Sequence, residues 1–269
     1  MRYYAGIDIG STAIKIVVLD EEERIAARHA APTGSHFHRN THDALQLLLA
    51  RSGLRRGDIV YLTTTGYGRK LFTEADESVS EITANAAGAG AGRAAGVVRT
   101  IINIGGQDSK VILLDGDGHI GNFAMNDKCA AGTGRFLEMT ARNLGLDVEE
   151  LGGLHRNAAT PLTINSTCTV FAESEIISLL AHGHGRDEII AGVHYSIARR
   201  IVRLAKRIGI EDAVFFDGGP ALNAGMVAAL EDELMRTVIV PELPQFTTAQ
   251  GAALLARSAC IGRGDQVSV

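Results

Sequence analysis

A repeated order of short strands and glycine-containing turns is the feature that most limits how this chain can fold. The N-terminal part contains strand-like segments at residues 3–9, 13–19 and 24–30, then a helical segment at 41–51 and an apolar strand at 59–64. The strand pattern begins again at residues 100–104, 110–114 and 119–124. A strand-turn-strand-turn-strand unit repeated about a hundred residues later predicts two related α/β domains that face each other across a cleft.

The length of 269 residues also suits two domains of ordinary size. We expect a first domain at residues 1–97, rejoined by a C-terminal helix at about 247–269, and a second domain at residues 98–246. The segment 84–96 is almost wholly alanine and glycine, which predicts a helix that passes close to a neighbouring backbone, with a linker as the alternative. A longer amphipathic helix is predicted at 190–208.

The composition indicates an ordinary soluble protein. Charged residues make up 21% and hydrophobic residues 46% of the chain, and the net charge of -5 argues against a nucleic-acid-binding surface. The apolar runs are interrupted well before the roughly 20 residues of a membrane span, and no signal peptide is indicated. Three widely spaced cysteines do not resemble a secreted disulfide framework. We therefore expect a cytoplasmic location, with no membrane or nucleic-acid partner.

Three glycine-containing turns follow strand-like segments and predict a nucleotide site. The turn within residues 6–15 combines Asp8 at a strand end, backbone N–H groups and hydroxyls that can bind phosphate, and Lys15 on the returning strand; an ordinary hairpin is the alternative. The second repeat places Gly105-Gly106-Gln107-Asp108-Ser109-Lys110 at the equivalent position. A third turn, Asp217-Gly218-Gly219-Pro220-Ala221-Leu222-Asn223, precedes a helix and could pack against a base and ribose. No P-loop or dinucleotide fingerprint occurs.

Two cysteines precede predicted helices. Cys129 lies in a small-residue turn, and Cys168 follows the potential capping hydroxyls of Ser166 and Thr167. A helix N-terminus carries roughly half a positive charge, which lowers a thiol pKa and favours anionic metal ligands. The alternative is that both are small buried residues or reactive thiols. An iron-sulfur cluster needs four thiolates, which two copies of the chain would supply.

The motifs resemble those of known ATPases along the whole chain. The three turns resemble the phosphate-1, phosphate-2 and adenosine motifs of the acetate kinase, sugar kinase, Hsp70 and actin superfamily. The blocks at residues 126–137 and 166–175, with Gly66-Tyr67-Gly68-Arg69, resemble signatures of the 2-hydroxyacyl-CoA dehydratase activators, which the related benzoyl-CoA reductase ATPase subunits share. The chain departs from this pattern at Asp217-Gly218-Gly219-Pro220, where threonine-glycine-glycine is expected.

The resemblance implies a fold and a set of nucleotide contacts. The fold would be a pair of duplicated actin/Hsp70/acetate-sugar kinase-like (ribonuclease H-like) α/β domains with ATP and magnesium in the interdomain cleft. Asp8 would hold magnesium through water, and Gln107 or Asp108 would orient the attacking water. The residues expected to bind ATP or ADP are Gly10, Ser11, Thr12, Ala13, Ile14, Lys15, Gly105, Gly106, Gln107, Thr133, Gly218, Gly219, Asn223 and Gln245.

The resemblance also implies an activity. Such proteins are homodimeric ATPases in which one 4Fe-4S cluster is bound by two cysteines of each subunit, here Cys129 and Cys168. They would take a low-potential electron from ferredoxin or flavodoxin and deliver it to an iron-sulfur 2-hydroxyacyl-CoA dehydratase. An ATPase subunit of a benzoyl-CoA-type reductase is the alternative, because no motif marks the face that docks the electron acceptor. Cys260 lies outside the matched blocks and is interpreted as structural.

Two more distant alternatives share the same fold. A small-molecule kinase would use the cleft to phosphorylate a metabolite, and an actin-like or chaperone-like switch would use ATP only to change partners. His182, His184 and His194 could suggest a metal site, but the glycines around His184 indicate a loop. We leave these histidines out of the predicted site.

Overall fold

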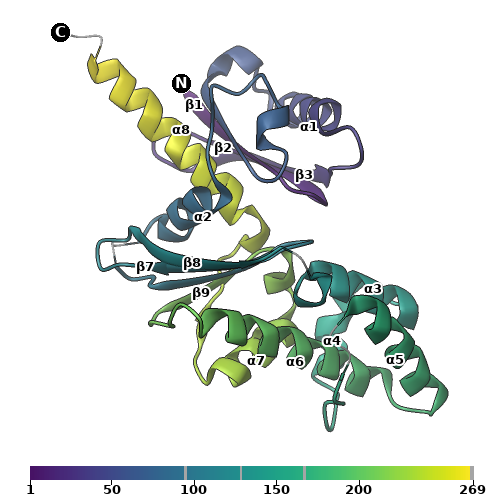
Figure 1. Cartoon of the computed structure of the whole chain (residues 1–269). Coiled ribbons are helices and arrows are strands. Elements are labelled where there is room, and N and C mark those ends of the chain that lie inside the picture. The colour runs from purple at the N-terminus through teal and green to yellow at the C-terminus, as the bar shows by residue number, and fades with distance from the viewer. Residues whose placement is uncertain (94–95, 128, 166–167, 267–269) are drawn as a thin grey trace. The chain divides into compact units, whose positions relative to one another are not determined.

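The computed structural model describes residues 1–93, 96–127, 129–165 and 168–266, with the backbone alone for 263–266. It divides into two compact units, unit 1 with residues 1–97 and 245–269 and unit 2 with residues 98–244 (Figure 1). Each unit contains one five-stranded sheet in which an antiparallel meander is extended by parallel strands. The predicted α/β class is confirmed, and the repeated strand order in the sequence corresponds to a repeated sheet.

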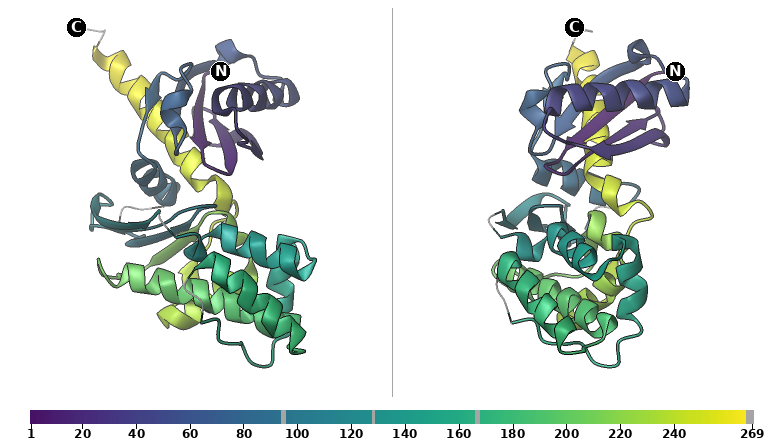
Figure 2. Two further views of the ribbon diagram at one scale, coloured as in Figure 1. Left: turned by 45° about the vertical axis from the view of Figure 1, so that its right-hand side comes forward. Right: turned by 90° about the vertical axis from the view of Figure 1, so that its right-hand side faces the viewer.

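In unit 1 the sheet order is β3-β2-β1-β4-β5. The helices α1 and α8 cover opposite faces of this sheet (Figure 2). Alternate residues of β1 face opposite sides, so Ile7 and Ile9 share a core cluster with the apolar residues of α1, whereas a Cβ at Gly6 would overlap the backbone of α8. The elements of unit 1 are β1 (Tyr3–Ile9), β2 (Ala13–Leu19), β3 (Ile25–Pro32), α1 (Phe37–Ser52), η1 (Arg56–Asp58), β4 (Ile59–Thr65), η2 (Arg69–Leu71), β5 (Glu77–Ser78), α2 (Glu81–Gly90) and α8 (Thr247–Gln266).

The alanine- and glycine-rich segment is a helix, α2, packed closely against α8. A Cβ at Gly88 would overlap the carbonyl oxygen of Thr247, and a Cβ at Gly251 would overlap that of Ala84. The predicted helix with a close backbone neighbour is therefore confirmed, but its predicted end is wrong. It ends at Gly90, and Gly92 has a positive φ of +65° that interrupts helical geometry. Residues 94–95 lie outside the described part.

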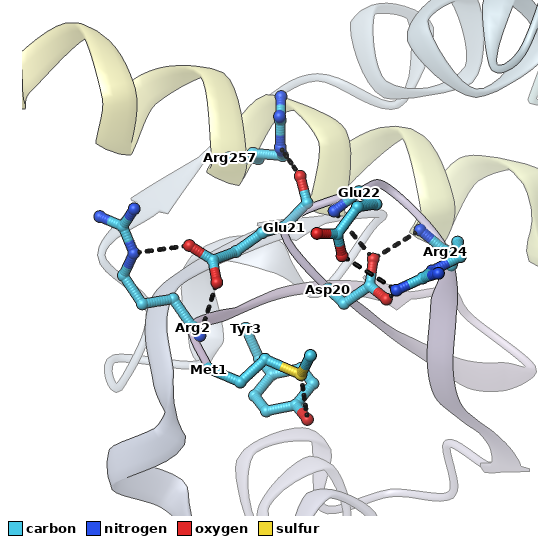
Figure 3. Close-up of polar contacts among 8 residues, drawn as sticks. All are labelled: Met1, Arg2, Tyr3, Asp20, Glu21, Glu22, Arg24 and Arg257. Carbon is cyan, nitrogen blue, oxygen red and sulfur yellow. Dashed lines mark hydrogen bonds and ion pairs between the residues drawn. The ribbon is translucent and has the colours of Figure 1, made fainter.

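The middle of α8 is bound to the turn between β2 and β3 by a hydrogen bond and an ion pair. Arg257 donates from Nε to the carbonyl oxygen of Glu21 at 3.1 Å (Figure 3). The Arg257 side chain also pairs with Glu23 at 3.0 Å. Asp20 organises the same turn, because its Oδ1 accepts the backbone N–H of Arg24 at 2.9 Å and its Oδ2 pairs with the Arg24 side chain. These hydrogen bonds hold the Asp20 carboxyl pKa below its ordinary value, although burial acts in the opposite direction.

In unit 2 the sheet order is β10-β9-β6-β7-β8, and the long helix α6 supplies much of the core. The predicted helix at 190–208 begins earlier and ends at Ala205, with Gly209 at a φ of +98° beyond it. The elements of unit 2 are β6 (Thr100–Ile104), β7 (Ser109–Leu114), β8 (Ile120–Asn126), η3 (Ala130–Gly132), α3 (Gly134–Leu144), η4 (Val148–Glu150), α4 (Leu151–His155), α5 (Thr169–Ala181), α6 (Arg186–Ala205), β9 (Val214–Asp217), η5 (Gly219–Leu222), α7 (Ala224–Leu234) and β10 (Val238–Ile239). The short η6 (Pro244–Phe246) follows β10.

Among the residues that the structure describes, no helix combines the length and the apolar character needed to cross a membrane.

Candidate functional site

The turn between β1 and β2 holds a carboxylate and an ammonium group together. Asp8 and Lys15 are opposite each other in the strand register, and Lys15 Nζ lies 3.2 Å from Asp8 Oδ2. The Gly10 N–H donates to the Ala13 carbonyl at 3.1 Å and closes the turn. Thr33 adds a 2.7 Å hydrogen bond from its hydroxyl to the Gly10 carbonyl. The expected strand-turn-strand segment is therefore present, with its charged pair at the end of β1, and phosphate binding by the turn stays a prediction.

The segment after β4 lies against the other side of Asp8. Gly66 has a φ of +92°, and a Cβ there would lie 2.6 Å from Asp8 Oδ1. The Gly68 N–H donates to the Ile9 carbonyl at 2.9 Å, and Arg69 donates to the Gly66 carbonyl at 3.1 Å. The sequence marked residues 66–69 as a motif without a site role. Their glycines could have indicated a close backbone approach, but not to which residue.

The turn between β6 and β7 also holds a lysine beside an aspartate, but this aspartate comes from the turn itself. Lys110, a buried residue, lies 2.8 Å from Asp108 Oδ2, and the Gly105 N–H donates to the Asp108 carbonyl at 2.9 Å. The residue opposite Lys110 is Asn103, so an amide stands where unit 1 has Asp8. Gln107 at the tip is exposed. The turn therefore presents the side chain of Gln107, while Asp108 is engaged by the lysine.

The first turn of α3 is hydrogen-bonded to this β6–β7 turn. The Gly134 N–H donates to the Gly105 carbonyl, and the Arg135 N–H donates to the Gly106 carbonyl, both at 2.9 Å. Gly134 allows this close approach, because a Cβ there would lie 3.2 Å from the Gly105 oxygen, a tight contact. Thr133, predicted to bind nucleotide, is wholly buried as the residue before this helix and donates to the Ala130 carbonyl at 2.8 Å.

The third turn lies beside the second. β6 and β9 are parallel neighbours, so their carboxyl ends meet at one edge, where Asn103 donates to Asp217 at 2.8 Å. Gly218 has a φ of +95°, and a Cβ there would overlap the Ile104 carbonyl. The backbone thus requires glycine at Gly218, and two of the three predicted turns are brought together within unit 2.

Both the oxygen and the nitrogen of the Asn223 side-chain amide form hydrogen bonds within the protein. Its Oδ1 accepts the N–H groups of Gly225 at 2.9 Å and Met226 at 3.1 Å and so caps α7. Its Nδ2 lies 3.1 Å from His194 Nε2. The expected nucleotide contact of Asn223 stays a prediction, whereas its capping role is a function that sequence reasoning did not identify.

His194 is a buried neutral histidine that positions Asn223. Because its Nε2 accepts from Asn223, its proton lies on Nδ1, which is 3.0 Å from His155 Nδ1. Burial, with a smaller contribution from His155, lowers the pKa of His194 to about 3. The same burial effect lowers the pKa of His155. His194 therefore contributes hydrogen bonds rather than charge.

Both cysteines of interest belong to unit 2. Cys129 precedes the three-residue helix η3, is half-buried and packs partly against the core. The helix expected after the small-residue turn of Cys129 is α3, which begins at Gly134 and has Gly145 as its C-terminal cap, and η3 lies within that turn. Cys168 is exposed and is itself the N-terminal cap of α5, with its carbonyl accepting from Ala172 at 2.9 Å. The hydroxyls of Ser166 and Thr167, expected to cap this helix, and Lys128 lie outside the described residues.

Large apolar side chains are exposed along α5 beside Cys168. Val170 is 68%, Phe171 69% and Ile177 54% exposed. An exposed apolar patch of this kind is typical of a surface that contacts another molecule. Cys260, in contrast, lies on α8 in unit 1 and packs with Tyr4 and Tyr61.

The comparison with protein families shows to which family the chain belongs. The model of the BadF/BadG/BcrA/BcrD ATPase family matches residues 5–256. The chain belongs to this family. Within it, the chain is 46% identical over 254 residues to the 2-hydroxyisocaproyl-CoA dehydratase activator of Clostridioides difficile, covering 94% of each protein. It is 47% identical to the activator of lactoyl-CoA dehydratase of Anaerotignum propionicum, over 96% of this chain and 98% of that protein.

Structural comparison agrees with the family assignment. A structure of the Clostridium difficile 2-hydroxyisocaproyl-CoA dehydratase activator with bound ADPNP superposes with a TM-score of 0.93 at 44% identity, covering 99% of this chain and 98% of that one. A ROK family glucokinase from Streptomyces griseus, 17% identical, covers 95% of this chain and 99% of its own with a TM-score of 0.58. The predicted sugar kinase-like fold is therefore confirmed for this ATPase.

A more distant family member bears on the alternative electron acceptor. A benzoyl-CoA reductase subunit of Thauera aromatica is 32% identical over 271 residues, covering 94% of this chain and 93% of that protein. The dehydratase activators are thus the more similar group.

Proposed function

We propose that this protein is an ATP-hydrolysing activator that transfers a low-potential electron to a 2-hydroxyacyl-CoA dehydratase. The observation that carries the proposal is the 46% identity to a dehydratase activator over 94% of both chains. An ATPase subunit of a benzoyl-CoA-type reductase is the second candidate, and the lower identity of 32% to a subunit of such a reductase makes it the weaker one. Ferredoxin or flavodoxin would supply the electron.

The charged turns support nucleotide binding by both units. Each turn joins a lysine to an aspartate, as Lys15 with Asp8 and Lys110 with Asp108. Backbone N–H groups and a lysine together suit phosphate oxygens. Asp8 Oδ1 is buried without a hydrogen-bond partner among the described residues, so it fits an acceptor for the water shell of magnesium. When bound, magnesium would neutralise charge on the phosphates.

Gln107 is the better candidate to orient the attacking water. It is exposed at the tip of the β6–β7 turn, whereas Asp108 is held by Lys110 at 2.8 Å. Phosphoryl transfer depends mainly on positioning and charge neutralisation, so an amide that orients water is sufficient. In this proposal Asp108 acts on the reaction indirectly by fixing Lys110.

The cysteines fit a shared 4Fe-4S cluster by donor type and number. Neither Cys129 nor Cys168 is in a disulfide, and one chain offers two thiolates where such a cluster takes four. A two-fold dimer supplies the other two. The exposed side chains of Val170 and Phe171, next to Cys168, support a partner surface there. When bound, the cluster would supply a one-electron carrier.

A short structural path connects the proposed nucleotide turn to the Cys129 segment. Gly134 and Arg135 at the start of α3 donate to the carbonyls of Gly105 and Gly106. Thr133 ties the same region to Ala130, the residue after Cys129. A change in the turn on ATP hydrolysis would therefore move backbone near Cys129. ATP can drive electron transfer only by favouring one of two conformations. We propose that the two conformations differ at this connection.

Iron content tests the function most directly. We expect anaerobically purified protein to contain about four irons and four acid-labile sulfides per dimer, and to activate a 2-hydroxyacyl-CoA dehydratase in the presence of ATP and a reductant. Cys129→Ser and Cys168→Ser should each lose the cluster and the activation, while Cys260→Ser should keep both. A full cluster in either of the first two variants, or ATP-dependent phosphorylation of a metabolite without iron, contradicts the proposal.

A further inference from the structure

The strand β4 ends beside Asp8 and brings a second polar side chain to it. β1 lies between β2 and β4, and Asp8 is opposite Lys15 on one side and Thr65 on the other. Residues opposite each other on neighbouring strands point to the same face of a sheet. Asp8 Oδ2 pairs with Lys15 at 3.2 Å, whereas Oδ1 lies on the β4 side next to Gly66. The Thr65 side chain is therefore on the face and at the strand end where Asp8 Oδ1 is found.

Two oxygen atoms at this position lack a hydrogen-bond partner in the described part of the chain. They are Asp8 Oδ1 and Thr65 Oγ1, and their residues are 7% and 0% exposed. Buried polar atoms of folded proteins are nearly always hydrogen-bonded, to protein, to water or to a ligand. These two atoms also lie together at the ends of adjacent strands, next to the proposed nucleotide turn, where one bound ligand would serve both.

The chemistry of the two atoms selects the kind of ligand. An ionised carboxylate only accepts hydrogen bonds, and a threonine hydroxyl can accept as well as donate. A ligand that serves both must carry donors, and the water molecules held by a divalent cation are strong donors. Magnesium characteristically keeps several of its waters when it binds protein and phosphate. Glycine at residue 66 keeps the approach to this oxygen clear of a side chain, because a Cβ there would lie 2.6 Å from Asp8 Oδ1.

We infer that the Thr65 hydroxyl is a further binding group for the hydrated divalent cation that accompanies the nucleotide, acting with Asp8 through the cation's water shell. The inference rests on the proposed nucleotide site at Asp8. It assigns a binding role to the end of β4. The sequence motifs assigned no binding role to this position.

Thr63 provides a matched control. It lies on the same strand and the same face as Thr65, is 0% exposed, and its hydroxyl also has no partner among the described residues. It is opposite Gly6, where α8 packs on the sheet, rather than opposite Asp8. Replacing either threonine with valine removes a hydroxyl at nearly constant volume, so the two variants differ mainly in their distance from Asp8.

The test measures ADP affinity of the full chain by calorimetry, once with EDTA and once with saturating Mg²⁺. In the wild type, Mg²⁺ should tighten ADP binding. Thr65→Val should leave the EDTA affinity unchanged and reduce the Mg²⁺-dependent gain about five- to tenfold, the effect of one lost hydrogen bond. Thr65→Ser should retain the gain, and Thr63→Val should behave as the wild type. Electron paramagnetic resonance of Mn²⁺ bound with ADP gives a second readout, in which Thr65→Val should weaken Mn²⁺ binding.

Each outcome decides one point. A wild type that binds ADP no more tightly with Mg²⁺ contradicts the proposed magnesium site itself. If Mg²⁺ tightens ADP binding equally in the wild type and in Thr65→Val, the role of Thr65 alone is overturned. The same conclusion follows if Thr63→Val loses as much of the Mg²⁺-dependent increase in ADP affinity as Thr65→Val does. Circular dichroism melting establishes that the variants are folded, and Thr65→Ala replaces Thr65→Val in the same measurements if valine prevents folding.

Discussion

His194 is the residue whose protonation the fold controls most strongly. Its pKa is about 3 in the folded protein against 6.5 for the ordinary side chain, because it is buried. The unfolded chain therefore takes up the proton first as pH falls. The stability that His194 contributes is fully present above about pH 6.5 and declines by roughly 1.4 kcal/mol per pH unit toward pH 3.

We therefore expect the free energy of unfolding, measured by urea titration at several pH values between 7 and 4, to fall less steeply in His194→Asn than in the wild type. The variant should also be less stable at pH 7, because Asn223 loses a hydrogen-bond partner. His182→Asn, at an exposed position, serves as the control and should keep the wild-type slope. Equal slopes in His194→Asn and the wild type would show that His194 is not buried as the structure has it.

Residues of the candidate site differ in how far the sequence could predict them. Asp8 and Lys15 are on consecutive strands joined by a short turn, so strand periodicity alone places them opposite each other. Gly66 reaches Asp8 only through a parallel strand pair, and Asn223 meets His194 only through the packing of α6 near α7. Contacts between distant segments depend on tertiary packing, which local patterns do not determine.

At the scale of elements, the contact between α2 and α8 gives a direct test of packing. A Cβ at Gly88 would overlap the Thr247 carbonyl, whereas a Cβ at Gly90, in the same helix, would meet nothing within 4 Å. Gly88→Ala should therefore lower the free energy of unfolding by about 1–3 kcal/mol through overpacking. Gly90→Ala should leave it unchanged or raise it by up to about 1 kcal/mol, because alanine favours helix.

Thermal or urea unfolding followed by circular dichroism measures both α2 variants side by side. A Gly88→Ala variant as stable as Gly90→Ala would mean that α2 and α8 do not approach as closely as described. The sequence could favour this helix over a linker because small residues allow a helix to pass close to a neighbouring backbone. It could not predict the end at Gly90, since glycine recurs at residues 88, 90, 92 and 96 and any of these glycines could end a helix.

At the scale of the whole molecule, the duplication in the sequence was sufficient to predict two related α/β units. Both sheets join an antiparallel meander to parallel strands, and both place a lysine beside an aspartate at the first turn. The shared cluster and the homodimer stay predictions, because a single chain contains only half of the required thiolates. Local patterns in one sequence do not determine which surfaces of two copies contact each other.

If the turns of both units bind one nucleotide, ADPNP should protect them together. We expect hydrogen–deuterium exchange at the amides of residues 10–13 and 105–108 to slow by about tenfold or more on addition of ADPNP and Mg²⁺, since tenfold corresponds to about 1.4 kcal/mol. The amides of Gly134 and Arg135 should slow with them, because they donate to the β6–β7 turn. The exposed side of α1 serves as the internal control and should exchange at its original rate. Protection confined to one unit would contradict nucleotide binding by both, and protection of both turns without residues 134–135 would remove the proposed link to Cys129.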